Sequence, residues 1–135
     1  LRARTAPIAV KPMNYKHIVV FCSCPDEAVA SRLASTLVTE GLAACVNRLP
    51  GAHSTYSWDG ALCDEAEVLL TIKTLAERYP ALEARIRALH PYEVPEIIAV
   101  PVVAGSAGYL DWVTRGSSGP NTQPRASRPD AAADR

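Results

Sequence analysis

The stretch that decides the fold is residues 17–41, HIVVFCSCPDEAVASRLASTLVTEG. Its first six residues form a nearly continuous apolar run, which is typical of a short strand covered on both faces. From Ala30 onward the apolar residues recur at intervals of three and four, which predicts an amphipathic helix that Gly41 ends. Pro25 suits the first helical position. The stretch therefore predicts a strand that leads directly into a helix.

The same change of period continues along the chain. Thr74 and Glu77 predict a capping box at the start of a second helix, and Pro80 fits its first turn. Pro101 confines the last strand to an edge or a bulge. The expected elements after the first helix are strand segments 43–49 and 53–58, a hairpin turn at Asp59-Gly60, a strand over 68–74, a helix that His90-Pro91 stops, a strand over 97–103 and a short helix with Tyr109, Leu110 and Trp112.

This order predicts an α+β fold, the ferredoxin-like split β-α-β-β-α-β sandwich, with an extra C-terminal helix. We expect the first and third strands to lie parallel in the centre of the sheet, and the fourth to lie antiparallel beside the first. Four segments would then gather at one end of the sheet: Cys22–Cys24, Ala43–Cys45, Lys73-Thr74 and His90–Glu96.

The folded part is predicted to be one domain over residues 13–115. Residues 1–12 predict a leader without structure. Residues 116–135 carry no large apolar side chain and predict a disordered tail that adds nothing to stability. The chain begins with Leu1 and its only methionine is Met13, so both are candidate translational starts.

Charge and hydropathy exclude two classes of partner. The chain carries 14 basic and 14 acidic side chains, which gives no electrostatic footprint for nucleic acid. No apolar run approaches the roughly 20 residues that a membrane span needs, and residues 1–12 lack the apolar core of a secretory signal. Without an export signal, the four cysteines are expected to be reduced thiols in a cytoplasmic protein.

Five short segments are distinctive in sequence and spacing: VFCSCPDE at 20–27, LAACVN at 42–47, YSWDG at 56–60, IKT at 72–74 and HPYEVPEI at 90–97. Together they resemble the CutA (divalent-cation tolerance) family over about residues 15–115. The resemblance implies a cytoplasmic homotrimer of ferredoxin-like subunits, with strands shared between subunits, that functions in tolerance to copper and other divalent metals. It also implies metal binding through Cys22 and His90. Some members carry a second histidine where this chain has Leu89.

The residues themselves support a metal site. Cys22 and Cys24, two residues apart on a strand, point to the same face, and the predicted topology brings His90 to the same end. Thiolate and imidazole are the ligands that copper and zinc prefer, and Glu93 is a further candidate ligand. We expect copper or another divalent ion to be held weakly and not to be required for folding. The alternative is structural, with Cys22 in the core and His90 at the negative end of the second helix.

A polar pocket is the second candidate site. Lys73, Tyr92 and Glu96 are expected at the same end of the sheet, where they bind a small polar ligand or form an ion pair at an interface. Cys45 is expected in the core, and Cys63 in an exposed loop. No Ser-His-Asp order, glycine-rich phosphate loop or paired-carboxylate spacing stands out, so the sequence predicts no enzyme.

Two other functions stay open at this point. The trimeric nitrogen-regulatory PII-type proteins also consist of ferredoxin-like subunits, and they bind small molecules in clefts between subunits. A long mobile loop would favour that function, and the hairpin at Asp59-Gly60 is short for one. The other alternative is a structural or anchoring assembly without a metal role.

Overall fold

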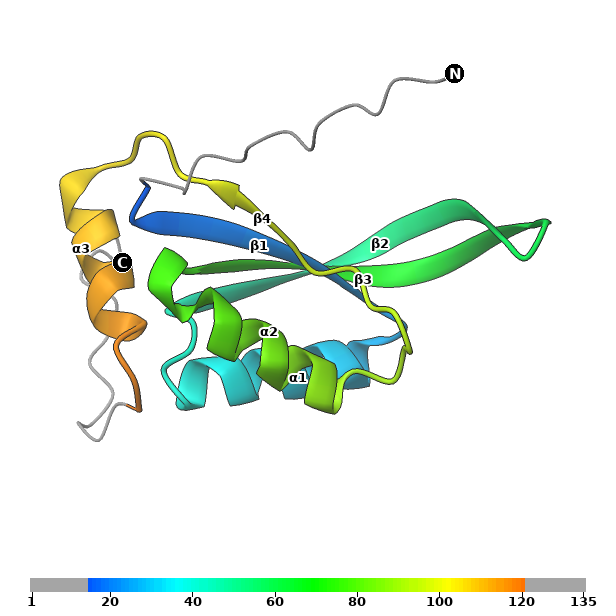
Figure 1. Ribbon diagram of the computed structural model, residues 1–135, viewed down its shortest axis with the longest axis horizontal. Helices are drawn as coiled ribbons and strands as arrows, with labels where there is room; N and C mark the ends of the chain where they lie inside the picture. Colours follow the sequence, from blue (N-terminus) through cyan, green and yellow to red (C-terminus); the bar gives the residue numbers. More distant parts are fainter. Residues whose placement is uncertain (1–14, 121–135) are drawn as a thin grey trace, which may run out of the picture.

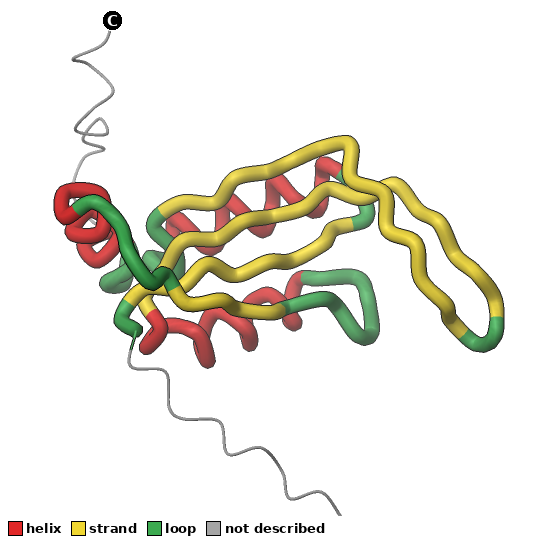
Figure 2. Tube along the Cα trace, turned by 90° about the horizontal axis from the view of Figure 1, so that it is seen from above, coloured by secondary structure: helices red, strands yellow, loops and turns green. Residues whose placement is uncertain are grey.

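The computed structural model of the chain describes residues 15–120. A four-stranded antiparallel sheet forms one layer, two helices cover one of its faces, and a third helix lies at one end (Figures 1 and 2). The predicted order of elements is confirmed. In sequence the elements are β1 (His17–Cys24), α1 (Glu27–Thr39), β2 (Cys45–Trp58), β3 (Ala61–Leu75), the 3-10 turn η1 (Ala76–Arg78), α2 (Tyr79–Leu89), β4 (Ile98–Pro101) and α3 (Ala107–Gly116).

The strands lie in the order β2-β3-β1-β4, so β1 has a neighbour on each side. The prediction that the first and third strands run parallel is wrong. They are antiparallel, with Cys24 opposite Val68 and Val19 opposite Lys73. The physical reason is that α1 returns the chain so that β2 runs in the same direction as β1, and the hairpin then reverses β3. The end of β1 and the end of β3 therefore lie at opposite ends of the sheet.

The β2–β3 hairpin is longer than predicted and extends beyond the body of the subunit (Figures 1 and 2). β2 continues through the expected bend with a register shift between Leu49 and Ala52. Asp59 and Gly60 both have positive φ, 50° and 77°, which fits the tight turn that their sequence predicts. Cys63 lies on β3, half-buried, and not in an exposed loop.

The core lies between the sheet and the two helices α1 and α2. Alternate residues of β1 (Ile18, Val20 and Cys22) face it and are at most 1% exposed. The predicted capping box of the second helix does not form, because β3 continues to Leu75 and the hydroxyl of Thr74 donates to the Leu42 carbonyl at 2.7 Å. None of the described helices is long and apolar enough to cross a bilayer.

Residues 116–120 belong to the predicted tail, and within the described part of the chain they contact the body of the subunit. Ser117 is fully buried, and its carbonyl accepts a hydrogen bond from Arg78 Nε at 2.7 Å. The Gly119 amide donates to the Gly41 carbonyl at 3.2 Å. Small side chains permit this close approach, so no pattern of large apolar residues marks it in the sequence. The predicted leader 1–12 and positions 121–135 of the predicted tail lie outside the described residues.

Candidate metal centre and neighbouring groove

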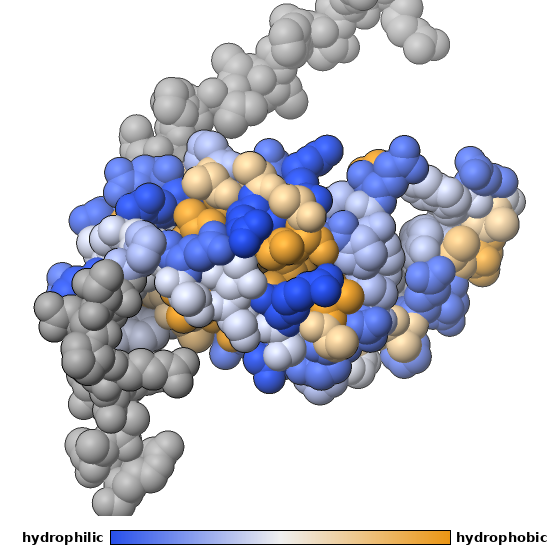
Figure 3. Space-filling model, turned by 90° about the horizontal axis from the view of Figure 1, so that it is seen from below, coloured by the Kyte–Doolittle hydropathy of each residue, from blue (hydrophilic) through white to orange (hydrophobic). Residues whose placement is uncertain are grey.

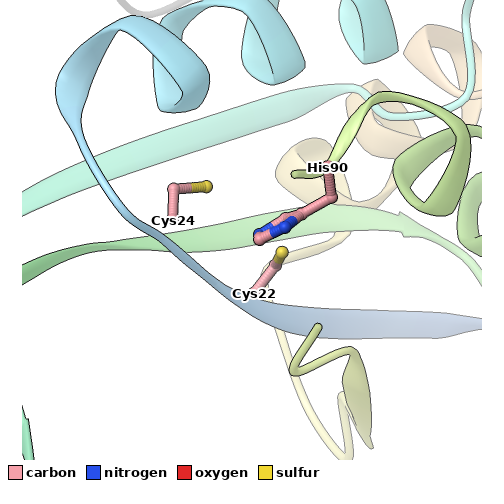
Figure 4. Close-up of side chains that lie close together, drawn as sticks. All are labelled: Cys22, Cys24 and His90. Atoms are coloured by element: carbon pink, nitrogen blue, oxygen red, sulfur yellow. The ribbon is translucent and has the colours of Figure 1, made fainter. Parts of the chain in front are cut away.

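Three side chains that can ligate a metal lie together at the end of β1 (Figure 4). The Sγ atoms of Cys22 and Cys24 and a ring nitrogen of His90 all lie within 4.8 Å of one another. Both cysteines are fully buried, and His90 is 7% exposed. The structure therefore brings together three of the four residues that the sequence analysis named as metal ligands.

Two local features of the sequence build this cluster. Cys22 and Cys24 occupy alternate positions on β1, so both thiols lie on the face of the sheet that the helices cover. His90 is the C-cap of α2, and its backbone is extended (ψ 135°), which is the conformation that the following Pro91 favours. The end of the strand and the end of the helix thus deliver their ligands to one buried point.

Both nitrogens of the His90 ring have partners. Nε2 lies 2.7 Å from the Ser23 carbonyl oxygen, and Nδ1 accepts a hydrogen bond from the Tyr92 amide at 3.1 Å. A carbonyl can only accept and an amide N–H can only donate, so these partners assign the neutral tautomer with the proton on Nε2. A metal ion would have to replace one of the two partners.

The pKa values of the two thiols shift in opposite directions. The hydrogen bond from Cys22 to Cys24 raises the pKa of Cys22, and burial raises it further. The same hydrogen bond lowers the pKa of Cys24. Cys24 is therefore the residue that becomes a thiolate first, and a thiolate is the form that binds metal.

The donor set fits a soft or borderline metal such as copper or zinc. In a tetrahedral site with metal–sulfur bonds of about 2.3 Å, neighbouring ligand atoms lie about 3.7 Å apart. The observed spread of up to 4.8 Å therefore needs only a small contraction of the side chains. Glu93 is exposed and is not part of the cluster. Three protein ligands leave one position open, unlike a closed structural zinc site.

The predicted polar pocket is only partly assembled. Lys73 lies opposite Val19 near the end of β3, away from the end of β1, and its ammonium group donates to Asn47 and Thr71. It is not near Tyr92 and Glu96, because the parallel arrangement on which its placement depended is wrong. Tyr92 and Glu96 do line a common groove, and Glu93 lines it with them.

This groove, which we call the acidic groove, has a volume of about 830 Å³ and runs between the β2–β3 hairpin and the segment that approaches β4. Three aromatic side chains line it, Tyr56, Trp58 and Tyr92, together with four carboxylates, Glu65, Glu67, Glu93 and Glu96. Sequence reasoning missed Glu65, Glu67 and Tyr56. Pairing the residues on either side of the Asp59-Gly60 turn would have placed all three on the same β-hairpin.

The carboxylates of the acidic groove accept hydrogen bonds from neutral hydroxyl groups. Tyr92 Oη donates to Glu67 at 2.9 Å, and Ser23 Oγ donates to Glu96 at 3.1 Å. Burial and the hydrogen bond to Glu67 raise the pKa of Tyr92. Burial and a hydrogen bond to Glu65 likewise raise the pKa of Tyr56, to about 12.

These tyrosines predict a loss of stability at high pH. A phenol whose pKa is higher in the folded chain than the usual value of about 10 stays protonated there after the unfolded chain has lost its proton. The free energy of unfolding should therefore fall as pH rises above 10. We expect the melting temperature of the Tyr92→Phe variant to fall less steeply than that of the parent between pH 9 and pH 11. Tyr15→Phe, at an exposed tyrosine outside the groove, is the matched control and should follow the parent.

Comparison with known proteins agrees with the fold and the sequence. The family model described as CutA1 divalent ion tolerance protein matches residues 18–116. The chain is 48% identical over 95 residues to the divalent-cation tolerance protein CutA of Thermus thermophilus, which covers 70% of this chain and 92% of that protein.

Solved structures give the same result. The crystal structure of CutA from Xylella fastidiosa is similar with a TM-score of 0.74 and 44% identity, over 75% of this chain and 97% of that one. A structure described as the periplasmic divalent cation tolerance protein CutA from Archaeoglobus fulgidus is similar with a TM-score of 0.73 and 31% identity, over 75% and 98% of the two chains. The chain belongs to the CutA1 divalent ion tolerance protein family.

Proposed function

We propose that the chain is a cytoplasmic, non-enzymatic protein of divalent-cation tolerance that binds copper, or another ion of similar preference, weakly at Cys22, Cys24 and His90. The observation that carries the proposal is the buried cluster of two thiols and one imidazole within 4.8 Å. The site would have one open coordination position, and His90 would have to give up a hydrogen bond to bind the ion. Both features suit a site that loads and releases its ion. Such a site buffers or senses metal, whereas a closed site stabilises a fold.

We also propose that the ferredoxin-like subunit assembles as a homotrimer, with the number three taken from the family resemblance. The support is the face of the sheet that no helix covers (Figure 2). Phe21 on β1 lies beside Ile98 on β4, and Val19 lies beside Val100. Ile98 and Val100 are 55% and 41% exposed in the single chain. An apolar sheet face of this kind is typical of a surface that another copy covers.

The opposite side of the subunit, which the helices cover, has a different distribution of hydrophobic and hydrophilic side chains. Figure 3 views the helix-covered side and shows hydrophilic side chains mixed with small hydrophobic patches. Hydrophobic side chains also gather near the far end of the hairpin in this view. The uncovered sheet face and the hairpin are thus the surfaces that favour contact with other copies.

Titration of the reduced protein with Cu⁺, held in solution by a competing chelator of known affinity, tests the metal proposal. Cys22→Ser and His90→Ala should each weaken binding at least tenfold, about 1.4 kcal/mol. Affinity should also fall as pH is lowered, because binding requires deprotonated thiols. Cys63→Ser and His53→Ala are the matched controls, since both residues lie outside the cluster. Absence of saturable binding to the parent, or equal binding by all variants, contradicts the proposal.

A further inference from the structure

Tyr92 contacts the imidazole of His90 through both its backbone and its side chain. Its amide donates to Nδ1 at 3.1 Å, while the proton on Nε2 is accepted by the Ser23 carbonyl at 2.7 Å. The tyrosine ring packs beside the imidazole, with the ring centroids 4.7 Å apart and the planes tilted by 55°. Tyr92 is therefore the neighbour that senses any change at the ring nitrogens of His90.

Metal binding by His90 would remove the acceptor of the Tyr92 amide, whichever ring nitrogen is used. If Nδ1 binds the ion, its lone pair is no longer available to the amide. If Nε2 binds the ion, the neutral imidazole carries its proton on Nδ1, and a protonated nitrogen cannot accept. A half-buried N–H group without an acceptor is unfavourable, so Tyr92 is expected to turn toward water or another acceptor.

The segment that contains Tyr92, residues 91–96, is held to the rest of the subunit by few interactions. It has no regular secondary structure, and its residues other than Tyr92 and Pro95 are exposed in the single chain. Its side-chain anchor is the Tyr92 hydroxyl, which donates to Glu67 on β3 at 2.9 Å. Because so little of the segment is buried, loss of one bond at Tyr92 is enough to shift it.

We propose that loading of the metal centre releases the Tyr92 amide and shifts segment 91–96 away from β3, so that this segment reports whether metal is bound. This role rests on the proposed metal function and adds the element that responds to the ion. A sensor needs such an element, because an ion at a buried site cannot itself be contacted by a partner. By linkage, the contacts that hold Tyr92 in place oppose metal binding, and removing one of them favours it.

Amide hydrogen exchange, followed residue by residue by NMR on the reduced full-length chain with and without Cu⁺, tests the release. The exchange rate of the Tyr92 amide should rise by about tenfold in the loaded protein. The His90 amide is the internal control, since it donates to the Ile86 carbonyl at 2.8 Å and should stay protected. Cys22→Ser, at a free Cu⁺ concentration that loads only the parent, should leave the Tyr92 amide unchanged.

The Tyr92→Phe variant tests the linkage with an effect opposite to that of a structural defect. It keeps the ring and the amide but removes the hydrogen bond to Glu67, so it should bind Cu⁺ about fivefold more tightly than the parent. Tyr79→Phe is the matched control. It removes the same hydroxyl from a tyrosine whose carboxylate partner is Glu83, outside the metal centre, and it should bind Cu⁺ as the parent does.

The possible failures are distinguishable. If the parent shows no saturable Cu⁺ binding, the proposed function and the role of Tyr92 are both wrong. If the parent binds Cu⁺ and the Tyr92 amide keeps its exchange rate, only the role of Tyr92 is wrong. Equal loss of protection at the His90 amide would show general unfolding of the end of α2. Equal or weaker Cu⁺ binding by Tyr92→Phe would show that Tyr92 does not oppose loading of the site.

Discussion

Replacing Gly41 with alanine is expected to lower the free energy of unfolding by about 2 to 4 kcal/mol. Gly41 has φ 68°, a left-handed conformation that costs an L-residue with a side chain about 1–2 kcal/mol. A Cβ at this position would also overlap the backbone carbonyl of Gly119. The overlap should displace residues 117–119 and break the hydrogen bond from the Gly119 amide to the Gly41 carbonyl. Urea denaturation followed by circular dichroism measures the change.

Gly51→Ala is the matched control for this substitution. Gly51 also has a positive φ, 86°, but a Cβ there would meet nothing within 4 Å. This variant therefore measures the backbone strain alone and should cost about 1 kcal/mol. Equal losses for the two variants would show that residues 117–119 do not pack on Gly41 in solution.

Placing a charge on the uncovered face of the sheet is expected to abolish assembly. Ile98 is 55% exposed in the single chain, so Ile98→Lys should leave the subunit folded. If this face is the interface, each subunit of the assembly would bury an unpaired ammonium group, which costs several kcal/mol per ion. Sedimentation velocity at micromolar concentration should show the parent as a trimer and the variant as a monomer.

The control for Ile98→Lys is Val103→Lys. Val103 is also an exposed apolar residue, at 74%, but it lies beyond the end of β4. This variant adds the same charge outside the sheet face and should sediment as the parent does. A trimer that persists in Ile98→Lys would place the subunit interface elsewhere, and the β2–β3 hairpin would be the first surface to examine.

The sequence was sufficient for the element order and for the cluster of Cys22, Cys24 and His90. The element order follows from local periodicity. The cluster follows from the positions of its residues at the end of a strand and at the end of a helix, each of which is followed by a proline. The relative direction of the first and third strands was predicted wrongly, although the predicted hairpin turn at Asp59-Gly60 already requires the chain to reverse between β2 and β3. The error in direction misplaced Lys73, whose side chain lies with Asn47 and not in the groove.

The acidic groove and the docked residues 116–120 were missed for different reasons. Glu67 is far from Tyr92 in sequence, and the two meet because β3 lies beside the end of β1, which the segment after α2 also contacts. Gly116 and Gly119 pack through backbone contacts, so no pattern of large apolar residues marks them. A Cβ on Gly116 would lie 2.8 Å from Ala44 Cβ, which shows how close this contact is. Contacts of this kind depend on shape complementarity, to which hydropathy patterns are insensitive.

Successive side chains of β1 point to opposite faces of the sheet, so the position of each residue in the strand decides which of the two sites it belongs to. Cys22 and Cys24 belong to the candidate metal centre, and Ser23 between them lines the acidic groove. A deletion of one residue earlier in the strand would shift its register and exchange the two environments. The serine would then face the buried histidine, and the thiols would face the carboxylates. Point substitutions can separate the two sites, but any change in the length of this strand alters both at once.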